Sequence, residues 1–197
     1  MKKQLANICL YYRIIAVPFF IIFFTLGWDS TVWMGVALIV FVTASLSDFF
    51  DGYFARKYNT VNDFGKLMDP LVDKVLTTAA FVCLVGFQVI APWGVIVILA
   101  REFLVSGVRS LAASNGRVIA ARFSGKLKTT TQMIAIILFI FAFSIQPVFT
   151  GDLTALSTSL RMAAVITYYL CIALTVYSGA EIIVDYLKSK PAKSKKK

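Results

Sequence analysis

Six apolar stretches, each close to the length that crosses a bilayer, divide the sequence. They lie near Ile8–Trp28, Val32–Phe54, Lys66–Val89, Pro92–Ala112, Leu127–Phe149 and Leu160–Leu187. A transmembrane helix needs about 20 predominantly apolar residues. Hydrophobic residues make up 59% of the 197 residues, and the mean hydropathy is +0.80. The sequence therefore predicts an all-α integral membrane protein with six transmembrane helices in a single domain, residues 1–187.

The formal net charge is +10, and the basic residues are unevenly placed. Lys and Arg gather in the N-terminal lead, in the segment after Phe54, in the segment 115–126 and in the tail 188–197. Short loops rich in Lys and Arg stay on the cytoplasmic side of a membrane. We therefore expect both termini, and a polar cavity beside the segment after Phe54, to lie on the cytoplasmic side of the cell membrane. The lysine-rich tail is predicted to be disordered and attracted to anionic lipid, and no nucleic-acid partner is expected.

Four aspartates interrupt the apolar sequence at Asp48, Asp51, Asp69 and Asp73. The first two are three residues apart and the last two are four apart, so each pair shares one face of a helix. The segment Lys57–Asp63 between the pairs is short and polar, which favours two antiparallel neighbouring helices. Because the two pairs lie at similar distances from this connection, their carboxylates are predicted to converge.

Converging carboxylates beside an apolar phase repel one another and lose solvation, so a bound cation is the expected remedy. Ligation by oxygen alone suits Mg²⁺, Mn²⁺ or Ca²⁺ rather than zinc. The alternative is a set of structural ion pairs with Arg56, Lys66 and Lys74. Carboxylates within the membrane are usually functional, which favours the metal site.

The aspartates belong to the pattern Asp-x2-Asp-Gly-x2-Ala-Arg-x8-Gly-x3-Asp-x3-Asp, which runs from Asp48 to Asp73. This pattern resembles the signature of the CDP-alcohol phosphatidyltransferase family, and every position matches. The resemblance implies that an alcohol displaces CMP from a CDP-linked lipid, with two divalent ions, Mg²⁺ or Mn²⁺, as cofactors. It also implies a homodimer, which is common in the family.

The resemblance further assigns roles to individual residues. It implies that the four aspartates hold the metal ions and that Asp73 also acts as the general base for the attacking hydroxyl. The residues that it places at the CDP-lipid are Asn7, Gly52, Ala55, Arg56 and Gly65. Asn7, Arg13 and Pro18 match a further family pattern, whereas Leu10 stands where the family commonly has Thr.

Basic residues outside the main motif suggest an anionic acceptor. Arg101 and Arg109 lie in the fourth apolar stretch, and Lys126 and Lys128 lie at the expected start of the fifth helix, where free N–H groups favour phosphate. The surrounding stretches resemble the phosphatidylglycerophosphate synthase branch of the family. The implied reaction transfers phosphatidyl from CDP-diacylglycerol to sn-glycerol 3-phosphate.

Several alternatives stay open from the sequence alone. Glu102 could form a buried ion pair with Arg109 or with another helix, and Arg13 could either reach the headgroups or line the cavity. The acceptor could be inositol phosphate, phosphatidylglycerol, serine or a choline-like alcohol. From other classes, a cation transporter or a non-catalytic lipid-binding scaffold could also place carboxylates in a membrane.

Overall fold

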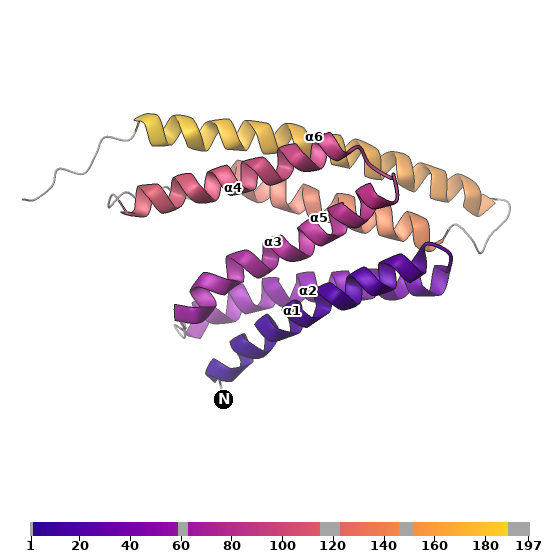
Figure 1. Cartoon of the computed structure of the whole chain (residues 1–197), viewed down its shortest axis with the longest axis horizontal. Helices are drawn as coiled ribbons and strands as arrows, with labels where there is room; N and C mark the ends of the chain where they lie inside the picture. The colour runs from indigo at the N-terminus through magenta and orange to yellow at the C-terminus, as the bar shows by residue number, and fades with distance from the viewer. Residues whose placement is uncertain (1, 59–62, 115–122, 146–151, 189–197) are drawn as a thin grey trace, which may run out of the picture. The chain divides into compact units, whose positions relative to one another are not determined.

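The structure is a computed structural model that describes the backbone of residues 2–58, 63–114, 123–145 and 152–188. Side chains are described for residues 11–47, 74–114, 123–145 and 156–188. Within these ranges the secondary structure consists of six α-helices (Figure 1): α1 (Lys2–Gly27), α2 (Thr31–Tyr58), α3 (Asp63–Gly86), α4 (Pro92–Ser114), α5 (Phe123–Ser144) and α6 (Asp152–Lys188). The predicted all-α class and the number of helices are confirmed.

The helices are longer than some of the apolar stretches that predicted them. Helix α1 begins at Lys2 rather than Ile8, and α6 begins at Asp152 rather than Leu160. Hydropathy marks only the part of a helix that suits lipid, whereas backbone hydrogen bonds continue the helix through polar residues. The predicted starts of the first and last helices were therefore too late.

Membrane-spanning length is clearest in the C-terminal half of the chain. Among the described residues, Phe123–Ser144 and Leu156–Lys188 are long and apolar enough to cross a membrane. Shorter apolar helical stretches cover Tyr11–Gly27, Thr31–Ser47 and Lys74–Gly86. Length and composition therefore agree with a membrane protein.

The chain forms two compact units. The first unit contains residues 1–89 and 136–164, and the second contains residues 90–135 and 165–197. Helices α5 and α6 each contribute residues to both units, so the units are not consecutive segments of the sequence. The predicted single domain over residues 1–187 stays a prediction.

The first unit is built around α1, which lies against α2 and α3 (Figure 1). Phe20, Phe24 and Phe41 are fully buried. The rings of Phe20 and Phe41 join α1 to α2 with centroids 5.6 Å apart, and the hydroxyls of Tyr12 and Thr43 lie 2.8 Å apart. Aromatic packing thus joins α1 to α2, one of the two helices that carry the predicted aspartates.

Helix α3 ends in a turn that holds one non-glycine residue in the left-handed region. Gln88 has φ 58°. Its N–H donates to the carbonyl of Val85 at 2.9 Å, and the N–H of Val89 donates to the carbonyl of Leu84 at 2.9 Å. This pair of bonds is the Schellman motif, which satisfies the last carbonyls of the helix.

The second unit brings α4 close to α6. Gly94 is buried, and a Cβ atom there would lie 2.3 Å from the hydroxyl of Tyr168 and 2.6 Å from Cδ1 of Ile172. The hydroxyl of Tyr168 also donates to the carbonyl of Ala91 at 3.2 Å. A larger residue at position 94 would therefore separate these two helices.

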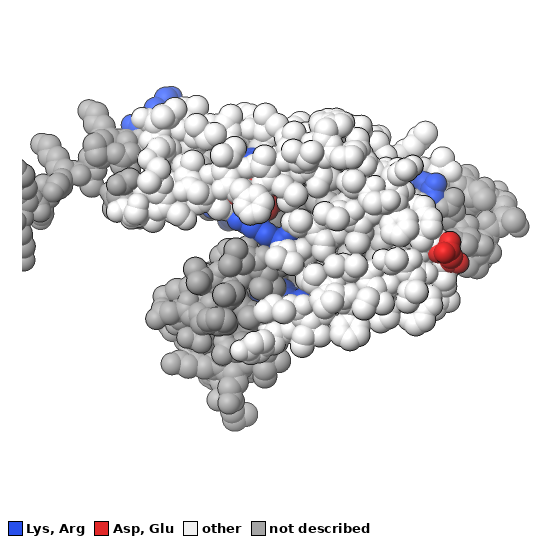
Figure 2. All heavy atoms as spheres, viewed as in Figure 1, with Lys and Arg blue, Asp and Glu red and all other residues white. Residues whose placement is uncertain are grey.

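Large apolar side chains remain on the surface of both units. Among the most exposed are Val32, Ile39, Ile96, Phe103 and Ile166, with exposed fractions between 63% and 73%. Charged atoms are sparse on the face drawn in Figure 2. Apolar side chains around the full circumference of a helix are characteristic of lipid-facing surfaces.

Candidate functional site

The two halves of the aspartate motif lie on consecutive helices, as the sequence predicted. Asp48 and Asp51 belong to the last part of α2, and Asp69 and Asp73 belong to the first half of α3. Four residues, 59–62, separate the two helices. The spacing therefore places each pair of aspartates on one face of its own helix.

The side chains of the motif lie outside the described residues, so their convergence stays a prediction. The same applies to the side chains of the residues expected at the CDP-lipid: Asn7 on α1, Gly52, Ala55 and Arg56 on α2, and Gly65 on α3. In the side chains that the structure does describe, no group of three or more His, Cys, Asp or Glu residues could hold a metal ion.

Arg13 on α1 is buried in the first unit, with an exposed fraction of 1%. A side chain that reached outward to the lipid headgroups would be more exposed than this. Burial therefore disfavours the interpretation in which Arg13 reaches the headgroups, and its place beside the predicted cavity stays a prediction.

Arg101 on α4 contacts α6 through a neutral partner. Its Nη2 donates to Oγ of Ser178 at 2.8 Å. A Cβ atom at Gly179 would lie 2.9 Å from Cγ of Arg101, so the aliphatic part of the arginine lies directly over that glycine. Arg101 is thus held on the surface of α6 by two adjacent small residues.

Glu102, the next residue on α4, forms an ion pair with a different helix. Its Oε1 accepts a short hydrogen bond from Nζ of Lys128 on α5. The side chains of Lys128 and Glu102 are 2% and 13% exposed. The interhelical ion pair considered for Glu102 is therefore present, and its partner is Lys128 rather than Arg109.

Arg109 and Lys126 differ from Lys128 because both are exposed. The side chain of neither residue forms a hydrogen bond or an ion pair with another residue whose side chain the structure describes. Among the described side chains, the charge of Lys128 is therefore balanced by Glu102, whereas Arg109 and Lys126 have no such carboxylate partner.

The hydroxyls of the three threonines that follow Lys128 donate to carbonyls of their own helix. The hydroxyls of Thr129 and Thr130 donate to the carbonyls of Gly125 and Lys126, each at 3.1 Å. Thr131 donates to Leu127 in the same way. Such bonds to the preceding turn occupy the hydroxyl protons, so these protons are not available to a phosphate.

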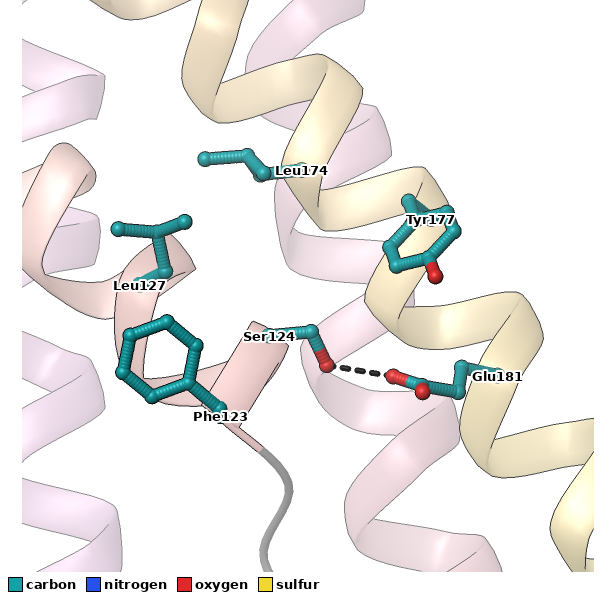
Figure 3. A pocket seen from close by; sticks show the side chains of 6 residues that line it. All are labelled: Phe123, Ser124, Leu127, Leu174, Tyr177 and Glu181. Atoms are coloured by element: carbon teal, nitrogen blue, oxygen red, sulfur yellow. Dashed lines mark hydrogen bonds between the residues drawn. The ribbon is translucent and has the colours of Figure 1, made fainter.

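A groove lies between the first turns of α5 and the later part of α6 (Figure 3), and its volume is about 570 Å³. Phe123, Ser124 and Leu127 come from α5, and Leu174, Tyr177 and Glu181 come from α6. Oγ of Ser124 donates to Oε2 of Glu181 at 2.5 Å. The groove is mainly apolar, and its one charge is negative, so it does not suit a phosphate.

The sequence did not identify the residues of α6 that contact side chains on α4 and α5. The sequence assigned no role to Ser178 and Gly179 beside Arg101, and it did not identify Glu181 as the partner of Ser124. Small residues within an apolar helix often mark a close helix contact. That signal could have identified the segment, but it could not have identified the partner.

Comparison with known proteins decides the family. The family model described as CDP-alcohol phosphatidyltransferase matches residues 3–177. The chain belongs to this family. The family predicted from the aspartate motif is thus confirmed.

Three relatives illustrate the similarity within the family. Each is named CDP-diacylglycerol–glycerol-3-phosphate 3-phosphatidyltransferase. The Mycoplasma pneumoniae protein is 36% identical over 90% of this chain and 85% of its own length. The Haemophilus influenzae protein is 31% identical over 95% and 94%. The Bacillus subtilis protein is 51% identical over 98 residues, and there the match spans 50% of this chain and about half, 51%, of the relative.

Proposed function

We propose that this member of the CDP-alcohol phosphatidyltransferase family transfers the phosphatidyl group from CDP-diacylglycerol to sn-glycerol 3-phosphate, releasing CMP and forming phosphatidylglycerophosphate. The observation that carries the reaction class is the complete aspartate motif on α2 and α3. The names of the relatives that match nearly the whole chain agree with glycerol 3-phosphate as the acceptor. The protein is thus an enzyme of phospholipid synthesis.

The donor set of the motif suits a hard divalent cation, because Asp48, Asp51, Asp69 and Asp73 offer only carboxylate oxygen. Two ions, Mg²⁺ or Mn²⁺, would neutralise the pyrophosphate and the charge that develops on the leaving CMP. These four residues would hold them.

The reaction itself is an in-line displacement at the phosphorus nearer the lipid. Asp73 takes the proton of the acceptor hydroxyl as the new oxygen–phosphorus bond forms and the bond to CMP breaks. The carboxylate is a weak base beside a metal, so its role requires that nearby positive charge stabilise the alkoxide. Arg56 binds the pyrophosphate, and Gly52 and Ala55 leave room for the nucleotide. Asn7 and Gly65 complete the donor site.

The acceptor phosphate is assigned to Arg101, Arg109, Lys126 and Lys128. Arg109 and Lys126 are exposed and unengaged by the other described side chains, and Arg101 has only a neutral hydroxyl partner. Lys128 contributes less than the other three, because Glu102 already balances its charge. A neutral alcohol would not require this number of cations.

The membrane placement follows from the distribution of charge and apolar residues. All six helices cross the bilayer, and the termini and the active site face the cytoplasm, since the basic segments lie on that side. The enzyme acts as a homodimer, as its family membership suggests. CDP-diacylglycerol reaches the site from the membrane, and glycerol 3-phosphate reaches it from the cytoplasm.

CMP release by purified protein in detergent with Mg²⁺ and CDP-diacylglycerol tests this function. Glycerol 3-phosphate, inositol phosphate, phosphatidylglycerol and serine are offered separately, and Asp73→Asn is the control. Release with glycerol 3-phosphate alone, and its loss in the variant, is the expected result. CMP release with a different acceptor would overturn the proposal that glycerol 3-phosphate is the acceptor. No release with any of the four acceptors would overturn the proposed reaction. Metal flux into proteoliposomes that contain no CDP-lipid would instead indicate a transporter.

A further inference from the structure

The side chain of Arg101 packs against two adjacent residues of α6, Ser178 and Gly179. Ser178 is fully buried, with an exposed fraction of 0%, and its Oγ accepts the hydrogen bond from Nη2 of Arg101 at 2.8 Å. Ser178 in turn lies 3.3 Å from the carbonyl of Thr175, to which its hydroxyl donates. The serine oxygen is therefore oriented by its own helix to accept from the arginine.

Gly179 provides the space that this arrangement needs. The Cβ atom of any other residue would lie 2.9 Å from Cγ, 3.9 Å from Cδ and 3.7 Å from Nε of Arg101. The close contact involves the part of the side chain nearest its own backbone, which has little freedom to move. A substitution at Gly179 would therefore displace the whole arginine rather than only its tip.

Ser178 and Gly179 hold the side chain of Arg101 without neutralising the charge of its guanidinium. The adjacent carboxylate, Glu102, is committed to Lys128, and Nε of Arg101 has no hydrogen-bond partner among the residues that the structure describes. Arg101 is half-buried, and a charge withdrawn from water is normally paired with an opposite charge. An arginine fixed by a neutral hydroxyl keeps its positive charge for another anion.

The geometry points to Ser178 and Gly179 as positioning residues for acceptor recognition, which orient Arg101 toward the phosphate of glycerol 3-phosphate. This inference rests on the proposed function. Neither residue touches the substrate. Each acts through Arg101. Ser178 directs the guanidinium through its hydrogen bond, and Gly179 leaves the space that the arginine side chain occupies. Preorganised side chains of this kind bind a ligand more tightly because less freedom is lost on binding.

Ser178→Ala and Gly179→Ala test the inference, with Gly107→Ala as the matched control. Gly107 also lies in a helix, on α4, and a Cβ atom there would meet no atom within 4 Å. We expect the KM for glycerol 3-phosphate to rise about tenfold in both test variants, as for loss of one hydrogen bond to a charged group. The KM for CDP-diacylglycerol should not change, and the control should keep both values.

A double-mutant cycle with Arg101→Ala distinguishes an effect of Ser178 on the position of Arg101 from a general disturbance of the protein structure. Once the arginine is absent, Ser178→Ala should raise the KM for glycerol 3-phosphate no further. An equal rise with and without Arg101 would overturn the inference, as would a similar rise in the KM for both substrates.

Calorimetric binding of glycerol 3-phosphate, without the lipid donor, provides a readout that does not depend on turnover. Weaker binding by Ser178→Ala and Gly179→Ala, with normal binding by Gly107→Ala, is expected. If the wild type binds and converts glycerol 3-phosphate but the variants match it, the positioning inference alone fails. If the wild type neither binds nor converts it, the proposed function fails and the inference fails with it.

Discussion

Lys128 on α5 and Glu102 on α4 form an ion pair inside the second unit, although they are 26 residues apart in the sequence. Both side chains are almost completely removed from the surface. A buried ion pair contributes little when compared with an apolar pair, but loss of one partner leaves an uncompensated charge in a poorly solvating interior. The pair therefore joins two helices whose relative position sets that of Arg101, next to Glu102.

Replacement of Lys128 alone should destabilise the protein strongly. We expect Lys128→Met to lower the stability by about 3 kcal/mol, because Glu102 remains buried without its partner. Thermal unfolding in detergent, followed by tryptophan fluorescence, measures this change. The double variant Lys128→Met/Glu102→Leu should recover most of the loss, and Lys126→Met, at an exposed site, should have little effect. A double variant less stable than Lys128→Met would contradict this prediction.

Each of the four motif aspartates should be essential for turnover. Replacement of Asp48, Asp51, Asp69 or Asp73 by Asn should lower the rate of CMP release by at least about a hundredfold, because metal ligation or proton transfer is lost. Chelation of divalent ions should abolish the activity, and Mg²⁺ should restore it. Asp29→Asn is the matched control, since Asp29 is an exposed aspartate near the turn between α1 and α2. Full activity in any of the four variants would remove that residue from the site.

Arg109→Ala should affect substrate binding but not stability. Arg109 is exposed and makes no ion pair with the other described side chains, so its loss leaves no buried charge. We expect the KM for glycerol 3-phosphate to rise about tenfold, as for loss of one charge-assisted hydrogen bond, at an unchanged melting temperature. Arg109→Lys should retain part of the affinity, and Lys188→Ala, which removes another exposed cation at the end of α6, serves as a control. An unchanged KM in Arg109→Ala would indicate a neutral or zwitterionic acceptor.

Gln88→Gly should stabilise the protein slightly. The left-handed conformation of Gln88, with φ 58°, costs a residue with a side chain about 1 kcal/mol more than glycine, and part of this gain is offset by the greater freedom of glycine in the unfolded chain. The side chain is exposed, so little packing is lost. We expect a small rise in the melting temperature for Gln88→Gly and a fall for Gln88→Val, because a β-branched side chain resists this conformation. A fall in both variants would show that the side chain of Gln88 matters more than its backbone.

The sequence was most informative where one local pattern decides the outcome. Apolar length predicted six helices, and spacing within the aspartate motif predicted that its two halves lie on α2 and α3. Hydropathy was less informative about the start of α6, because a helix continues through polar residues such as those after Asp152. Gly86 ends α3, but the residue that adopts the left-handed conformation is Gln88. Helix ends depend on hydrogen bonds that composition does not reveal.

The sequence by itself determined the helical class and the family, and it carries the proposed reaction, since these depend on apolar length and on the spacing of a few residues within one or two helices. Only the tertiary structure decided the partners of the charged residues. Lys128 is paired with Glu102, Arg101 rests on Ser178 and Gly179, and Ser124 donates to Glu181. Each of these contacts joins residues from different helices. Their geometry depends on how the helices pack, and periodicity along a single helix carries no information about the residue that faces it from another.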